Sequence, residues 1–229
     1  MKLSFQHCSV RGPGHIRSGL PNQDYLMCGC WGPYWAAVVC DGMGSRTRSD
    51  IGSREAAKAA LQSVKMLGFE VNNRVIVEML YRQWLARLKQ LHIQPTEAVT
   101  TCILVWGVSD GSFRYGHLGD GLLASPRMPI SCALGSAFSN ETTGLGISKH
   151  LSDWQFGSGT LREHDNSLFL MTDGISEDLT NPTAFCGYLS EVLLHKNTRQ
   201  AKKWLHRQLS DWPTPGHSDD KTLLMLRHY

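Results

Sequence analysis

Apolar and polar residues alternate along this chain in a way that predicts blocks of strands separated by pairs of helices. The first strands are expected at residues 3–10, 25–31 and 34–40, and a Gly-Pro turn joins the last two as a hairpin. Apolar residues spaced by 3.6 predict helices over 51–67 and from about 73 to 92. The remaining expected elements are strands at 98–108, 112–120, 167–174 and 221–227, and helices at 183–194 and 198–210.

This order of elements predicts an α+β protein. Hairpin turns within each strand block favour antiparallel sheets, and helices grouped against such sheets give a layered sandwich rather than a βαβ fold. The second helix should bury one apolar stripe, made of Val77, Leu80, Trp84, Leu85, Leu88 and Leu91. Residues 124–166 are rich in Gly, Ser and Pro and are expected to form mobile loops beside a site. No linker or repeat interrupts the chain, so residues 1–229 are predicted to be one domain.

Composition narrows the class of protein. With 41% hydrophobic and 19% charged residues, the chain is globular, and a net charge of +3 gives no reason to expect a nucleic-acid partner. No segment reaches the ~18 apolar residues of a membrane helix, and the N-terminal residues do not have the pattern of a signal peptide. The seven cysteines are scattered, which favours free thiols and a cytoplasmic protein.

Aspartates recur where apolar strands end. The pattern of an apolar run followed by Asp-Gly occurs at Asp41, Asp120 and Asp173. Further aspartates flank two other strands: Asp24, Asp219 and Asp220. Any one of them has an ordinary explanation as a turn residue. Several carboxylates gathered at one end of a sheet would repel each other, and a hard divalent cation such as Mg²⁺ or Mn²⁺ would remove that cost.

Six short motifs in order resemble the protein phosphatase 2C family of metal-dependent serine/threonine phosphatases. They are "GLPNQD", "VVCDGMGS", "EAVTTCILVW", "YGHLGDG", "LFLMTDGISED" and "SDDKTLLML", and the chain is most similar to compact bacterial members. The resemblance implies a four-layer αββα sandwich, in which two antiparallel sheets are flanked by pairs of helices. It also implies two, possibly three, Mg²⁺ or Mn²⁺ ions that activate a water for attack on phosphoserine or phosphothreonine.

The resemblance also implies roles for individual residues. Asp41, Asp173 and Asp219 form the expected catalytic set, with Asp41 bridging two metals and the other two holding the first metal. Further metal contacts are expected from the Gly42 carbonyl, from Asp24 through water, and from Asp120 at an additional position. Thr100 and Thr101 match a threonine pair expected to support the site.

The chain departs from the family pattern at several positions. Gln23 replaces a glutamate that binds the second metal, and its neutral oxygen remains a candidate ligand. Gly19 stands where the family has a phosphate-binding arginine, which leaves Arg17 or His15 as candidates to reach the phosphate. Met43 stands where eukaryotic members carry a histidine that protonates the leaving group.

These observations lead to one main function and two alternatives. The main expectation is a Mg²⁺/Mn²⁺-dependent protein serine/threonine phosphatase, a monomer that acts on a kinase or its target in a bacterial signalling pair. The departures are the reason to consider a weakly active or non-catalytic phosphoprotein-binding relative as an alternative, against which the retained Asp41, Asp173 and Asp219 argue. A hydrolase of small phosphoesters would use the same metal site.

His117 lies within a strand pattern near Asp120, and we expect it to be a hydrogen-bonded core residue.

Overall fold

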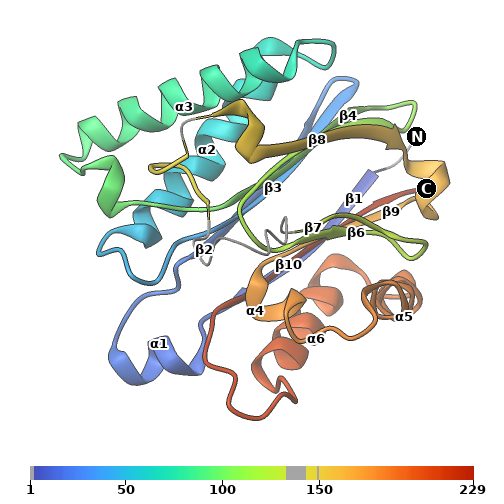
Figure 1. Ribbon diagram of the computed structural model, residues 1–229. Coiled ribbons are helices and arrows are strands. Elements are labelled where there is room, and N and C mark those ends of the chain that lie inside the picture. Colours follow the sequence, from blue (N-terminus) through green and yellow to red (C-terminus); the bar gives the residue numbers. More distant parts are fainter. Residues whose placement is uncertain (1–2, 133–142, 149) are drawn as a thin grey trace.

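Two five-stranded antiparallel sheets lie face to face in the computed structural model, which describes residues 3–132, 143–148 and 150–229 (Figure 1). The first sheet has the order β1 (Leu3–Val10), β10 (Lys221–His228), β9 (Ser167–Met171), β6 (Leu122–Ala124), β7 (Pro129–Cys132). The second has the order β2 (Asp24–Trp31), β3 (Tyr34–Asp41), β4 (Cys102–Val108), β5 (Ser112–Leu118), β8 (Trp154–Thr160).

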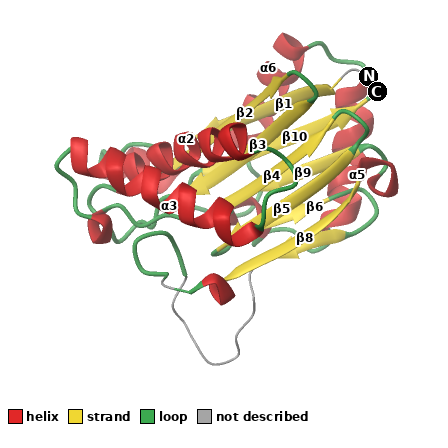
Figure 2. Ribbon diagram, turned by 90° about the horizontal axis from the view of Figure 1, so that it is seen from above, coloured by secondary structure: helices red, strands yellow, loops and turns green. Residues whose placement is uncertain are grey.

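Helices cover the outer faces of both sheets. The pair α2 (Ser49–Leu67) and α3 (Asn73–Gln90) packs on the second sheet, as the view from above also shows (Figure 2). The pair α5 (Pro182–Leu194) and α6 (Thr198–Ser210) packs on the first sheet. The shorter helices are α1 (Pro13–Ser18), α4 (Asp173–Ser176), η1 (Pro95–Glu97), η2 (Leu151–Asp153) and η3 (Leu161–His164). The predicted four-layer αββα sandwich is therefore confirmed.

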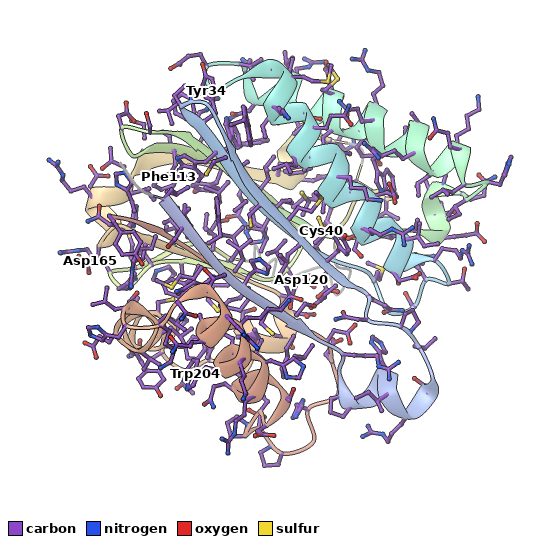
Figure 3. All side chains as sticks on the ribbon, turned by 180° about the vertical axis from the view of Figure 1, so that it is seen from behind. Tyr34, Cys40, Phe113, Asp120, Asp165 and Trp204 are labelled. Carbon is purple, nitrogen blue, oxygen red and sulfur yellow. The ribbon has the colours of Figure 1, made fainter. Side chains whose placement is uncertain are left out.

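Strand β3 shows why its sequence is apolar without interruption. Val38 and Cys40 pack with the α2 and α3 side chains, whereas Trp35 and Val39 pack between the two sheets. Both faces of the strand are buried, so its residues cannot alternate between apolar and polar. The strand also spans the molecule, because Tyr34 lies at one end of the sandwich and Cys40 lies towards the end where Asp120 is found (Figure 3).

Two sequence-based expectations were wrong. The segment 124–166 is not simply loop, because β7, β8 and two short helices lie within it. Strand β8 was not predicted because its sequence, "WQFGSGT", contains two glycines and, after its first residue, only partly buried or exposed residues. Residues 133–142 and 149 of the segment lie outside the described part of the chain. The buried face of α3 is made of Ile76, Leu80, Trp84 and Leu88, whereas Leu85 and Leu91 of the predicted stripe are exposed.

None of the helices in the described part of the chain is long and apolar enough to cross a membrane.

Candidate functional site

The β2–β3 hairpin places two aspartates opposite each other. Its tight turn pairs Trp31 with Tyr34, and the antiparallel register then pairs Asp24 with Asp41 at the far end. Directly opposed like charges destabilise a sheet. The hairpin therefore builds an unfavourable carboxylate pair, which indicates that something outside the chain compensates it.

The backbone around Asp41 is fixed by a threonine pair and a glycine. The Asp41 N–H donates to Thr101 Oγ1 at 2.9 Å, and the Thr100 hydroxyl donates to the Asp41 carbonyl at 2.8 Å. Both threonines thus lie where support for the site was expected. A Cβ on Gly42 would lie 2.5 Å from the Ser49 carbonyl oxygen and 2.9 Å from that of Gln23. Only glycine fits between these carbonyls without a shift of backbone.

Four aspartates line one cavity of about 280 Å³. Asp41 is the last residue of β3, Asp120 and Asp173 follow β5 and β9, and Asp219 precedes β10. The other lining residues are Gly14, His15, Gly42, Met43, Gly44, Thr100, Thr101, Thr143, Gly144 and Ser218. No lysine or arginine is found among these described residues, so His15 is the one side chain among them that can carry a positive charge beside the four aspartates.

Burial and mutual repulsion perturb these carboxyls. Burial raises the pKa of Asp24 and of Asp41 well above the ordinary value, and the neighbouring aspartates raise both further. The pKa of Asp173 is raised to about 6, chiefly by burial and then by the charges of Asp120 and Asp219. A proton thus partly replaces the positive charge that this geometry requires.

Unsatisfied oxygens mark where a cation fits. Asp24 Oδ2 accepts a hydrogen bond from the Thr172 hydroxyl at 2.9 Å, but its Oδ1 has no partner. Gln23 Oε1 and Asp173 Oδ1 are also buried without a partner. Buried oxygens without donors are rare and costly. Carboxylate and amide oxygens are the ligands that Mg²⁺ and Mn²⁺ prefer, so the donor set fits such an ion.

The approach to β10 is packed tightly against the N-terminal segment. Added Cβ atoms on Gly12 and Gly174 would collide with the backbone of Asp219 and Asp220. A nitrogen of His15 and carboxylate oxygens of these two aspartates lie within 4.8 Å of one another. Hydrogen bonds already engage Asp220 and the Nδ1 atom of His15, so this group is not an open metal site.

Comparison with known proteins gives the family. A sequence model of the protein phosphatase 2C family matches residues 11–210, which is most of the chain. The chain belongs to this family. No curated protein matches this protein phosphatase 2C member by sequence.

Solved structures share the fold of this protein phosphatase 2C chain at low identity. A structure described as a bacterial serine phosphatase is 15% identical, with a TM-score of 0.68, and the match covers 99% of this chain and 98% of that one. The serine/threonine phosphatase Stp1 from Staphylococcus aureus is 14% identical, with a TM-score of 0.68 and 100% and 96% covered. PppA, described as a key regulatory component of T6SS in Pseudomonas aeruginosa, is 17% identical, with a TM-score of 0.66 and 100% and 99% covered.

Not every residue singled out in the sequence reaches the cavity of this phosphatase fold. Arg17 is exposed on α1 and Gly19 ends that helix, and neither lines the cavity. Gln23 is buried, with its Oε1 3.6 Å from where a Cβ on Gly44 would lie. Met43 does line the cavity.

His117 occupies the core position expected of it. Its Nδ1 lies 2.8 Å from the Ser131 hydroxyl, and its Nε2 lies 3.2 Å from the Asp120 carbonyl oxygen. Burial lowers its pKa to about 4, so the ring is neutral at neutral pH. The neutral ring holds the backbone of Asp120, not its carboxylate.

Sequence reasoning gave Asp220 and α1 no role. Asp220 is 1% exposed and contacts His15, which the six-residue α1 carries to the cavity. The pattern "GPGH" before the first motif could have predicted α1, because proline is common at the first position of a helix and Pro13 occupies it. Nothing in the spacing places His15 beside a residue more than 200 positions later.

Proposed function

We propose that this chain is a Mg²⁺- or Mn²⁺-dependent protein phosphatase that hydrolyses phosphoserine and phosphothreonine. One observation carries the proposal: aspartates from four separate segments line a single cavity in a member of the protein phosphatase 2C family. Such a cluster is unfavourable without a cation, and its orphaned oxygens are suited to bind one.

We infer the residue roles from the family resemblance, and the cavity lining and the unpartnered oxygens support them. Asp41, Asp173 and Asp219 are the proposed catalytic metal ligands, and the Gly42 carbonyl adds a further contact. Asp24 and Gln23 serve a second ion with their unpartnered oxygens, and Asp120 serves an additional position. When bound, the ions supply Lewis acidity that activates water and neutralises phosphate charge. The chain itself fixes the ligands, since Thr100 and Thr101 hold Asp41 in place.

The substrate and setting are inferred from the fold's relatives. Neighbours are described as a bacterial serine phosphatase and as a serine/threonine phosphatase, which supports a phosphoprotein substrate and a cognate kinase or its target as the partner. We treat residues 1–229 as one phosphatase domain that acts as a monomer. All seven cysteines are free, which suits the reducing cytoplasm. Arg17 remains a candidate for contact with the phosphoprotein outside the cavity, because its side chain is exposed.

A turnover assay tests the proposal. Hydrolysis of a phosphothreonine peptide and of p-nitrophenyl phosphate would be measured with Mn²⁺, with Mg²⁺ and with a chelator, for the wild type and Asp41→Asn. We expect turnover only with metal, a loss of at least about 100-fold in the variant, and a higher kcat/KM for the peptide. Absence of metal-dependent turnover would contradict the proposal and support the non-catalytic, phosphoprotein-binding alternative. A preference for small phosphoesters over every peptide would make the chain a small-phosphoester hydrolase.

A further inference from the structure

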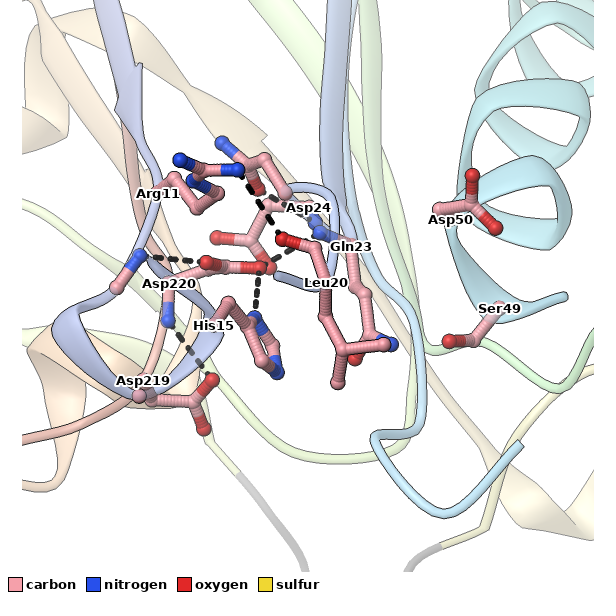
Figure 4. Close-up of polar contacts among 12 residues, drawn as sticks. Arg11, His15, Leu20, Gln23, Asp24, Ser49, Asp50, Asp219 and Asp220 are labelled. Carbon is pink, nitrogen blue, oxygen red and sulfur yellow. Dashed lines mark hydrogen bonds and ion pairs between the residues drawn. The ribbon is translucent and has the colours of Figure 1, made fainter. Parts of the chain in front are cut away.

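A buried carboxylate beside the cavity holds an imidazole. Asp220 Oδ1 accepts from the Gly12 N–H at 2.6 Å, and its Oδ2 accepts from the Gln23 N–H, also at 2.6 Å (Figure 4). His15 Nδ1 lies 2.9 Å from the same Oδ2. The side chain of Asp220 is 2% exposed and that of His15 is 16% exposed. The carboxylate is thus satisfied by donors on every side, and the imidazole is one of them.

This contact fixes which ring nitrogen is available for chemistry. A carboxylate only accepts hydrogen bonds, so Nδ1 carries a hydrogen and donates it to Asp220. The other nitrogen, Nε2, points away from Asp220 in Figure 4, and His15 lines the cavity of the four aspartates. Nε2 is therefore the ring nitrogen that does not take part in the contact with Asp220.

No other described cavity residue offers a nitrogen atom in its side chain. The lining consists of aspartates, threonines, glycines, one serine, Met43 and His15. The aspartates are needed as metal ligands, and hydroxyl groups are weak proton donors at neutral pH. The alkoxide of serine or threonine is a poor leaving group unless a proton reaches its oxygen. Within the described cavity, the side chain suited to supply that proton is His15.

We propose that His15, positioned by Asp220, is the general acid of the reaction. In the step, the attacking water oxygen forms a bond to phosphorus and releases one proton to solvent, while the bond from phosphorus to the ester oxygen breaks. The Nε2–H proton passes to that ester oxygen, which leaves as the serine or threonine hydroxyl, and His15 regains a proton from solvent. Asp220 is the positioning residue, because within the described part of the chain its carboxylate makes hydrogen bonds to His15 and to two backbone N–H groups. The inference rests on the proposed phosphatase function.

The test compares leaving groups. In His15→Asn, the side-chain amide replaces Nδ1–H and preserves the hydrogen bond to Asp220, but nothing replaces Nε2. We expect kcat/KM for a phosphothreonine peptide to fall about 100- to 1,000-fold, as for loss of a general acid. The fall for p-nitrophenyl phosphate should be at least about tenfold smaller, since a nitrophenolate leaves without a proton. His206→Asn on α6 removes an exposed imidazole and serves as the matched control.

Each outcome decides a different point. Equal losses for both esters, or no loss for either, overturn the role of His15 as general acid. Absence of metal-dependent turnover in the wild type refutes the proposed function instead. The ¹⁵N NMR spectrum of the metal-free protein tests the position of the His15 ring hydrogen without measuring activity. We expect the neutral His15 ring to carry its hydrogen on Nδ1, and a hydrogen on Nε2 would overturn the assigned geometry.

Discussion

At the scale of a single residue, Asp41 shows how a carboxyl suited to bind a metal also destabilises the metal-free fold. It lies opposite Asp24 in the hairpin and lines the same cavity as Asp173, so other carboxyls of the same charge crowd its own. This crowding is unfavourable in the metal-free protein and becomes useful only with a cation present. If Asp41 holds a metal as proposed, the carboxylate that binds the ion is also one that destabilises the metal-free protein.

Asp41→Asn should stabilise the metal-free protein at pH 8. Burial and the neighbouring aspartates raise the pKa of Asp41, so the native state holds its proton more tightly than the unfolded state does. Stability is therefore lost as pH rises through the native pKa, and a neutral amide avoids this loss. We expect the Tm in EDTA to rise by about 2–4 °C, or about 1 kcal/mol. The exposed Asp211→Asn on α6 is the control, and an unchanged or lower Tm in Asp41→Asn would contradict the expectation.

His117 should make stability depend on pH in the opposite direction. Its native pKa is about 4, whereas the unfolded value is about 6.5. The unfolded state binds more protons between these values, so the contribution is complete above about pH 6.5 and lost as pH falls towards 4. The shift corresponds to about 3 kcal/mol.

The measurement is urea unfolding of wild type and His117→Gln at several pH values. The difference in unfolding free energy between the two should shrink as the pH falls from 6.5 to 4. A difference that stays constant over this range would show that His117 does not titrate between the two states. His206→Gln controls for a histidine in solvent.

At the scale of elements, close backbone contact connects a helix to the site. A Cβ on Gly52 of α2 would collide with the backbone carbonyl of Ala98, and the Gly52 carbonyl accepts from the Trp84 indole at 3.1 Å. Ala98 lies two residues before Thr100, and Thr100 and Thr101 directly precede β4. Glycine at position 52 therefore lets α2 approach the segment that holds Asp41.

Gly52→Ala and Gly187→Ala should have opposite effects, although both glycines lie within helices. The first substitution should cost about 1–3 kcal/mol through overpacking. A Cβ on Gly187 of α5 meets nothing within 4 Å, so alanine should stabilise by about 0.5–1 kcal/mol through helix propensity. Chemical denaturation measures both, and equal effects would contradict the assigned packing.

Element order could be predicted from the sequence, but some contacts could not. The two-residue turn and equal arms of the β2–β3 hairpin bring Asp24 and Asp41 together by counting alone. The meeting of Asp120 with Asp173 depends on two sheets facing each other, which no local pattern encodes. In the four-residue β7 and the glycine-containing β8, the alternation of apolar and polar residues is too weak to predict a strand. For the aspartates, the family resemblance supplied what spacing could not.

At the scale of the whole molecule, metal binding should act as a stabilising ligand. An ion that binds the native state alone adds about 2.7 kcal/mol at 100 times its Kd. We therefore expect Mn²⁺ or Mg²⁺ to raise the Tm by roughly 5–10 °C, and a chelator to reverse the rise.

Thermal unfolding across a titration of each ion checks this expectation. Asp41→Asn should lose most of the rise, whereas Asp211→Asn should retain it. A Tm that does not respond to either ion in the wild type would contradict the proposed metal site.

The pairing of β1 with β10 has a consequence for the order of events during synthesis. Strand β1 lies at the edge of its sheet beside β10, and Asp220 holds both Gly12 and Gln23 by their backbone N–H groups. A nascent chain that still lacks residues 219–228 has neither the neighbour of β1 nor the anchor of the segment between Gly12 and Gln23. Residues 219–228 must therefore leave the ribosome before β1 gains its neighbour and before the segment from Gly12 to Gln23 can be anchored beside the cavity.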